Sequence, residues 1–120
     1  MKTKDEILDI IRHAIGTTGY HRFSGIPGFP VTTDGVFALA EAAGCYWLLD
    51  LIGSYQSDKQ LDKAFQVWKL KVDLVECSAV VSGYNDTKLI ITQKIPFTDF
   101  PLDELTLYLE YGVILLPNEH

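Results

Sequence analysis

The chain has 120 residues, of which 48% are hydrophobic and 22% charged, and its formal net charge at neutral pH is −6. This length is typical of one domain, so we expect residues 1–120 to form a single domain, and the composition excludes an intrinsically disordered chain. The acidic balance argues against direct nucleic-acid binding, because a protein that follows the phosphate backbone presents a basic surface.

The first predicted element is a helix over residues 3–15. Thr3 and Glu6 have the spacing of a capping box, and apolar residues then recur at helical intervals (Ile7, Leu8, Ile11, Ala14 and Ile15). Gly16 is placed to end this helix. The charged start of the pattern does not resemble the apolar core of a signal peptide, which favours a cytoplasmic protein.

A glycine-rich loop is predicted over residues 16–33. It contains four glycines and two prolines, residues that mark turns rather than sustain a helix. Residues 20–23 within it are a candidate short strand. A loop of this length is often functional or mobile.

The central prediction is a buried helix over residues 33–56. Its wheel is apolar on nearly all sides, and Trp47 is expected in the core. A membrane span is excluded because Glu41 and Asp50 interrupt the apolar run. Gly44 either permits the close approach of a neighbouring element or marks a kink.

Strands are predicted after residue 65, where the apolar residues begin to alternate. The expected strands cover residues 65–74, 76–82 and 88–95, a segment around 105–110, and 113–116, with turns at 83–86 and 111–112 and a rigid loop at 96–101. The predicted fold class is α+β, with an N-terminal helix and a buried central helix packed on an antiparallel sheet of four to five strands.

The two cysteines, Cys45 and Cys77, lie in apolar contexts far apart in the sequence. No CxxC spacing occurs, so we interpret both as reduced, buried thiols of a cytoplasmic protein. Known catalytic motifs are absent, and the three histidines lack metal-ligand spacing, so no metal, cofactor or catalytic residue is predicted.

Polar residues near the glycine-rich loop and the central helix form the candidate ligand-binding set. Asp50 falls in a strongly apolar stretch, where a carboxylate needs a partner, and Arg22 is the preferred one. The loop is therefore expected to pack over the helix, with His21 or Arg22 reaching Asp34 or Asp50. These residues form either a structural contact between the loop and the helix or a ligand pocket. The set comprises His21, Arg22, Asp34, Tyr46, Asp50, Tyr55 and Gln56.

The proline-bounded segment 96–101 holds the candidate partner contacts Phe97, Asp99 and Phe100. Exposed aromatic residues mark contact sites, but these two could also cap the core. No Lys or Arg follows Lys94, so the C-terminal part is either a solvated acidic end or a surface for a basic host protein.

Several fragments in this order resemble a family of small bacterial proteins known by a domain-of-unknown-function label and found in phage and mobile-element genomes. They are GYHRF, TTDGVFALAEAAGCYWLLDLIGSYQ, FQVWKL, IPFTDFPL and LYLEYGVILLP. The resemblance spans about residues 19–117 and leaves the N-terminal helix outside. It implies a small stand-alone cytoplasmic protein and supplies no catalytic residues.

Two hypotheses follow. The first is a non-enzymatic protein-interaction or accessory factor of phage or mobile-element origin, which could also be a homodimer. The alternative is a small-molecule binding protein or enzyme, with a pocket between the loop 16–33 and the central helix. The patterns do not decide whether the protein is an enzyme, although the absence of catalytic motifs favours a protein that is not one.

Overall fold

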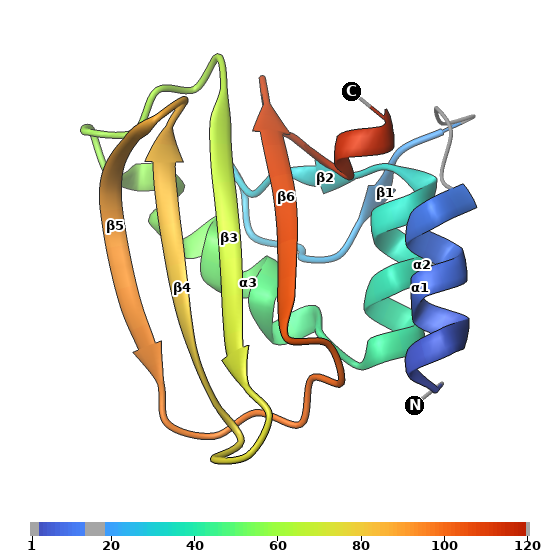
Figure 1. Cartoon of the computed structure of the whole chain (residues 1–120). Helices are drawn as coiled ribbons and strands as arrows, with labels where there is room; N and C mark the ends of the chain where they lie inside the picture. Colours follow the sequence, from blue (N-terminus) through green and yellow to red (C-terminus); the bar gives the residue numbers. More distant parts are fainter. Residues whose placement is uncertain (1–2, 14–18, 120) are drawn as a thin grey trace.

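The computed structural model describes residues 3–13 and 19–119. In these residues, three α-helices and a seven-stranded sheet confirm the predicted α+β class (Figure 1). The helices are α1 (Lys4–His13), α2 (Asp34–Ala43) and α3 (Tyr46–Ser54), and two 3-10 turns are η1 (Tyr55–Ser57) and η2 (Pro117–Glu119). The strands are β1 (His21–Arg22), β2 (Val31–Thr32), β3 (Gln66–Asp73), β4 (Ser78–Asn85), β5 (Lys88–Ile95), β6 (Glu104–Glu110) and β7 (Val113–Leu115).

The sheet is larger than the four to five strands predicted. Its order is β1-β2-β7-β6-β3-β4-β5, because the glycine-rich loop adds two short strands at one edge. The pair β2–β7 is parallel and the other pairs are antiparallel, so the sheet is mixed rather than purely antiparallel. In Figure 1, α3 lies behind β3 and β4, and α1 lies beside α2.

The alternation of apolar and polar residues along β3 and β6 correctly predicted which of their side chains lie in the core. Trp68, Leu70 and Val72 of β3 are buried, as are Leu105, Leu107 and Leu109 of β6. The turn predicted at residues 83–86 is wrong in position, because β4 continues to Asn85 and the chain turns at Asp86 and Thr87. Asp86 takes a positive φ of 57°, which an aspartate in a tight hairpin turn tolerates.

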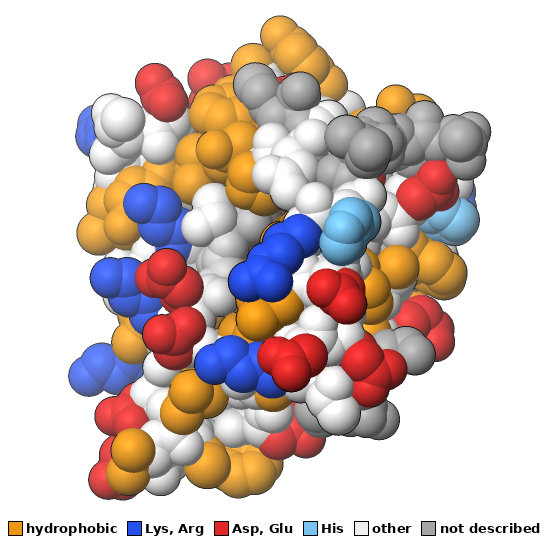
Figure 2. Space-filling model, turned by 45° about the vertical axis from the view of Figure 1, so that its right-hand side comes forward, with side chains coloured by type: hydrophobic (Ala, Val, Ile, Leu, Met, Phe, Trp, Pro, Cys, Tyr) orange, Lys and Arg blue, Asp and Glu red, His pale blue; other side chains and the backbone are white. Residues whose placement is uncertain are grey.

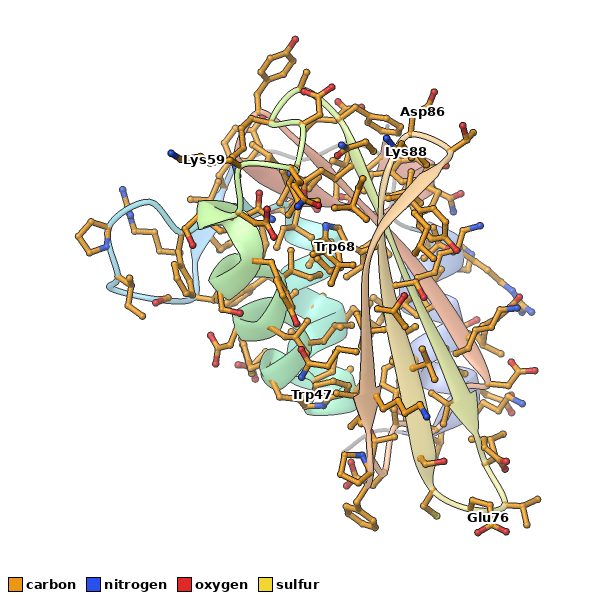
Figure 3. The ribbon with its side chains drawn as sticks, turned by 90° about the vertical axis from the view of Figure 1, so that its left-hand side faces the viewer. Trp47, Lys59, Trp68, Glu76, Asp86 and Lys88 are labelled. Carbon is orange, nitrogen blue, oxygen red and sulfur yellow. The ribbon has the colours of Figure 1, made fainter. Side chains whose placement is uncertain are left out.

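The predicted central helix is two helices. Gly44 takes the left-handed conformation, with φ 64°, and its N–H donates to the carbonyl of Ala40, which ends α2. The chain then restarts as α3 at Tyr46, two residues after Gly44. The break rotates α3 relative to α2, so Trp47 is half-buried rather than a core residue. In Figure 3, Trp68 is the tryptophan that lies between the sheet and the helices.

The predicted loop packs on α3 as well as on α2. A Cβ on Gly53 would lie 2.6 Å from a ring carbon of Phe29, so this glycine permits close contact between the loop and α3. Gly53, rather than Gly44, therefore has the close-approach role.

The N-terminal helix follows its predicted pattern. The amide of Glu6 donates to Thr3 Oγ1, and the amide of Thr3 donates to Glu6 Oε1, which is the expected capping box. Ile7 is fully buried. The predicted final turn, residues 14–16, lies outside the described residues. None of the described helices is both long and apolar enough to cross a membrane.

Candidate functional site

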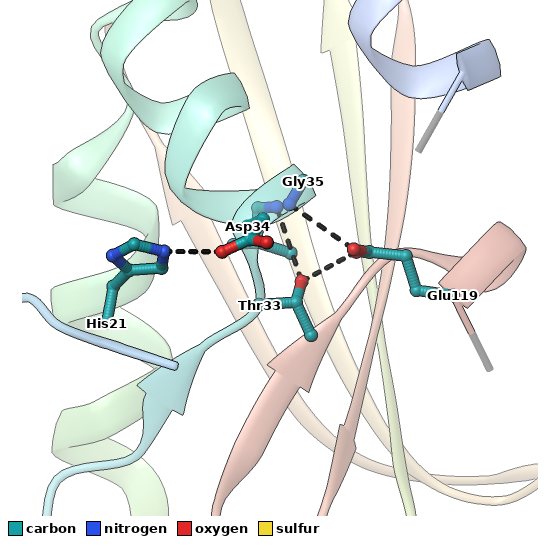
Figure 4. Close-up of polar contacts among 6 residues, drawn as sticks. His21, Thr33, Asp34, Gly35 and Glu119 are labelled. Atoms are coloured by element: carbon teal, nitrogen blue, oxygen red, sulfur yellow. Dashed lines mark hydrogen bonds and ion pairs between the residues drawn. The ribbon is translucent and has the colours of Figure 1, made fainter. Parts of the chain in front are cut away.

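A carboxylate from the C-terminal end of the chain caps the start of α2. Thr33 Oγ1 donates to Glu119 Oε1 at 2.6 Å, and the amide of Gly35 donates to Glu119 Oε2 at 3.3 Å (Figure 4). Thr33 Oγ1 also accepts from the amide of Val36. A carboxylate is favourable here because the first amides of a helix carry positive charge. This arrangement joins β2, α2 and η2 and accounts for Glu119 as a structural residue.

His21 and Asp34 form the predicted contact between the loop and the helix. His21 Nε2 lies 2.7 Å from Asp34 Oδ1, and both side chains are about two-fifths exposed, at 37% and 41% (Figure 4). The imidazole stacks on Phe37, with ring centroids 4.4 Å apart and planes 9° apart. The pair therefore ties β1 to α2 at the surface.

The predicted pairing of Arg22 with Asp50 is wrong. Both residues are exposed, and no ion pair joins them in the part of the chain that the structure describes. The buried face of α3 carries Leu48, Leu49 and Ile52, and Asp50 falls on the opposite side, where water solvates its carboxylate. The apolar sequence around Asp50 therefore did not indicate its burial.

Tyr46 bonds to a glutamate of α2 instead of lying open for a ligand. Its hydroxyl donates to Glu41 Oε1 at 2.6 Å. Desolvation of the phenol and the neighbouring Glu41 carboxylate raise the pKa of Tyr46 to about 12. The side chain links the two halves of the helical segment across the break at Gly44.

Tyr55 and Gln56 take part in two separate sets of side-chain hydrogen bonds with residues of the sheet. Tyr55 Oη donates to Gln93 Oε1 at 2.5 Å. The side-chain amides of Gln56 and Gln66 bond to each other reciprocally, at 3.0 and 2.9 Å, and Trp68 Nε1 donates to Gln66 Oε1. Gln66 is fully buried, so these bonds satisfy polar groups inside the core.

The predicted partner contacts divide between the surface and the core. Phe97 is 72% exposed, whereas Phe100 is 2% exposed and packs in the core. Two more exposed apolar side chains, Leu74 and Val75, lie in the turn between β3 and β4, at the same end of the sheet as the connection from β5 to β6 that carries Phe97 (Figure 1). We call Leu74, Val75 and Phe97 the sheet tip.

Backbone hydrogen bonds hold the two loops of the sheet tip together. The amide of Thr98 donates to the carbonyl of Cys77 at 2.7 Å, and the amide of Val72 donates to the carbonyl of Asp103 at 2.8 Å. A hollow of about 260 Å³ lies between the loops and is lined by Leu74, Cys77 and Phe100 among others. Figure 1 shows both connections at the same end of the sheet.

The segments that form the sheet tip also carry acidic residues, and two lysines, Lys71 and Lys94, line a hollow with Asp73 at the same end. Asp73, Glu76, Asp99 and Asp103 are all exposed. Asp73 Oδ1 also accepts from the amides of Val75 and Glu76, which fixes the turn. Figure 3 shows Glu76 at the far end of the sheet, away from the helices.

The two cysteines occupy different environments, and neither forms a disulfide. Cys45 is buried, and desolvation raises the pKa of its thiol to about 12, so it is not a reactive thiolate at neutral pH. Cys77 was predicted to be buried but is exposed, because it ends the tight turn with a φ of 56°.

Four surface cavities of about 260–650 Å³ are lined by described residues, and the predicted pocket between the loop and the helix is not one of these four. None of the four has a lining residue from 19–33. Within residues 3–13 and 19–119, no three His, Cys, Asp or Glu side chains gather to form a candidate metal site.

Sequence reasoning missed Glu119, Leu74 and Val75. Glu119 contacts a residue 86 positions earlier, and a contact at that separation has no local signal. Leu74 and Val75 continue the apolar pattern of β3, so the sequence alone does not separate them from the core. The nearby Asp73 was the available signal for a turn, because its carboxylate can bond amides two and three residues later.

Comparison with known proteins identifies a family but no characterised relative. No curated protein and no solved structure matches the chain. The sequence profile of a family of unknown function, DUF6876, matches residues 5–120. This match includes most of α1, so the expectation that the N-terminal helix lies outside the family resemblance is wrong. The chain belongs to the DUF6876 family of unknown function.

Proposed function

We propose that this protein is a non-enzymatic interaction factor that binds a basic protein partner through the sheet tip. The observation that carries the proposal is the exposure of Val75 and Phe97, at 88% and 72%. Large apolar groups in water are unfavourable unless another surface covers them, and aromatic residues often dominate binding energy at protein interfaces.

The form of the sheet tip supports a protein partner. The hollow of about 260 Å³ at this end of the sheet offers a concave site, lined by Leu74, Cys77 and Phe100 among others. A partner side chain placed there would contact Leu74 and Phe100 and would be shielded from water. Interfaces commonly combine such a central apolar contact with a polar rim.

The acidic rim supports a partner with lysine or arginine around its apolar contact. Asp73, Glu76, Asp99 and Asp103 would attract such residues and orient the encounter. Nucleic acid fits less well. On the face shown in Figure 2, Lys and Arg side chains are interspersed with Asp and Glu, without a continuous basic surface.

The test compares capture by variants that differ in one exposed aromatic residue. Wild type, Phe97→Ser and the control Tyr111→Ser, in which the replaced tyrosine is 81% exposed, would each be used as bait in a lysate of the native host, with quantitative mass spectrometry. We expect one basic protein to bind wild type and Tyr111→Ser stoichiometrically and to lose at least tenfold occupancy with Phe97→Ser.

The dependence of partner binding on salt concentration is the second measurement. The same partner should dissociate as ionic strength rises, because the charges at the rim are exposed. Equal capture by wild type and Phe97→Ser would overturn the proposal. Copurification of a small molecule that both variants retain would favour the alternative of a ligand-binding protein.

We further propose that the protein acts in the bacterial cytoplasm and originates from phage or mobile-element genomes. The sequence resemblance supports the origin, and the two free cysteines agree with a reducing compartment. Genes for phage or transfer functions should adjoin members of the family, and random genomic neighbours would contradict the proposed origin.

A further inference from the structure

The two edges of the sheet differ in length. At one edge, β1 has two residues, whereas β5 at the other edge has eight. Within the part of the chain that the structure describes, β5 pairs with β4 only. Its other side therefore presents a row of backbone N–H and C=O groups that can pair with another strand. Figure 3 views the molecule from this side.

A bulge divides β5 into two parts. Ile91 is opposite Gly83, but Leu89 is opposite Tyr84, so Ile90 is the extra residue. The regular part of the strand is therefore residues 91–95, with Gln93 at its centre. This part contains β-branched residues and a single charge, that of Lys94, which is a composition suited to strand pairing.

The register of the sheet assigns a face to each residue of this segment. Ile91, Gln93 and Ile95 are opposite the buried residues Gly83, Val81 and Ala79, so they face the core side. Thr92 and Lys94 face the solvent side. An antiparallel partner must place residues of the same face opposite one another.

We propose that β5 pairs with β5 of a second copy of this chain, antiparallel about a two-fold axis at Gln93. In this register Ile91 is opposite Ile95 of the second copy, and Thr92 is opposite Lys94. The apolar residues meet on the core side, and no like charges meet on the solvent side. A two-fold interface is the commonest way for identical chains to associate.

Neighbouring registers are less favourable. An axis at Ile91 places Lys94 opposite Lys88 of the second copy, and an axis at Lys94 places the two Lys94 side chains opposite each other. Like charges directly opposite are destabilising. An axis at Thr92 places Lys94 opposite Ile90, the bulged residue, where the pairing is irregular.

The proposed register also involves part of the sheet tip. Because the strands are antiparallel, the two turns between β3 and β4 would lie at opposite ends of the joined sheet. Phe97 lies two residues beyond β5 and would be opposite Leu89 of the second copy, so variants of Val75, rather than of Phe97, should leave the dimer intact.

The test uses charge changes at Thr92, which is exposed, with sedimentation equilibrium to measure the dimer dissociation constant. Wild type should form a dimer of twice 13.5 kDa. Thr92→Lys would place like charges opposite each other at two equivalent positions and should weaken the dimer about two- to thirtyfold. Thr92→Glu should strengthen it by a similar factor, since it would face Lys94. The double variant Thr92→Lys/Lys94→Glu should restore dimer formation.

The controls are Thr87→Lys and Thr87→Glu, the same changes at an exposed position of the same hairpin outside residues 91–95. Both should leave the dissociation constant unchanged, and circular dichroism would check the fold of every variant. A monomeric wild type at millimolar concentration would overturn the proposal. So would a dimer that Thr92→Glu weakens, because that result requires another register or another surface.

Discussion

The two ends of the molecule differ in the side chains that lie at the surface. At the α2 end, polar groups bond to one another: Thr33 to Glu119, and His21 to Asp34. At the sheet tip, Val75 and Phe97 extend into solvent. In Figure 1, β2 and η2 mark the first end, and the β3–β4 turn marks the other.

The difference separates structural residues from candidates for binding. The sequence singled out the charged residues near α2, but the structure shows that contacts within the chain account for several of them. The sheet tip carries the exposed apolar side chains of Leu74, Val75 and Phe97. Changes at the α2 end should therefore affect stability, and changes at the tip should affect binding.

The largest effect on stability should come from Phe100→Ala, compared with Phe97→Ala in the same loop. Phe100 is 2% exposed, and deleting a buried phenylalanine costs about 3–5 kcal/mol in the free energy of unfolding. Phe97→Ala should stay within about 0.5 kcal/mol, as is usual for exposed positions. Urea denaturation measures both, and similar losses would show that the tip is part of the core.

The cap of α2 should give the next largest effect. Thr33→Ala should lower the free energy of unfolding by about 1 kcal/mol, because it removes the acceptor for the amide of Val36 and the donor to Glu119. Thr33→Ala and Glu119→Gln should be non-additive in a double-mutant cycle, since they share one hydrogen bond. Glu76→Gln, at the sheet tip, is the matched control and should have no effect.

The His21–Asp34 contact should contribute less, because both side chains are about two-fifths exposed. A double-mutant cycle with His21→Ala and Asp34→Asn should give a coupling free energy below about 1 kcal/mol. The partner captured through the tip should still bind to both variants. Loss of that partner without loss of stability would move the binding site to the α2 end.

The two thiols should differ in their reaction and in their effect on the pH dependence of stability. Cys77 should react with iodoacetamide in the folded protein, while Cys45 should react only after unfolding. The pKa of Cys45 rises from 9 to about 12 on folding, so the folded state keeps its proton between these values. Its contribution to stability is full below pH 9 and is lost as the pH rises toward 12.

Cys45→Ala should therefore flatten the decline of stability between pH 9 and 12. Tyr46 contributes a decline of the same sign, because its pKa is also raised, from 10 to about 12. Tyr46→Phe serves as the comparison that separates the two groups. A decline unchanged by either substitution would contradict these assignments.

Regular periodicity made most of the strands and the N-terminal helix predictable. The alternation of Trp68, Leu70 and Val72 fixes both the strand and its buried face. The strand β1 confirms the candidate short strand at residues 20–23, but β2 has only two residues, which is too short for any period, so the seven-stranded sheet was not predicted in full. Gly44 was compatible with a kink or a continuous helix, since glycine inside a helix costs only about 1 kcal/mol.

The break at Gly44 also explains the errors in the candidate site. Because α3 begins with a new orientation, the wheel drawn for one continuous helix placed Trp47 in the core, whereas the burial of Asp50 was wrongly inferred from its apolar neighbours in the sequence. The contact of His21 with Asp34 was predictable, because it follows from the cost of leaving a carboxylate unpaired near a histidine-bearing loop. Phe97 is exposed and Phe100 is buried because of the path of the loop between β5 and β6, and the composition of the loop does not specify that path.

The most direct test of the binding role of the sheet tip is site-specific photo-crosslinking in the native host. A photoreactive phenylalanine analogue would replace Phe97 or, as the control, Tyr111, which is 81% exposed in the turn between β6 and β7. We predict that position 97 crosslinks to one basic protein and that position 111 does not. Crosslinks to that protein from position 111 alone, or from neither position, would contradict the account.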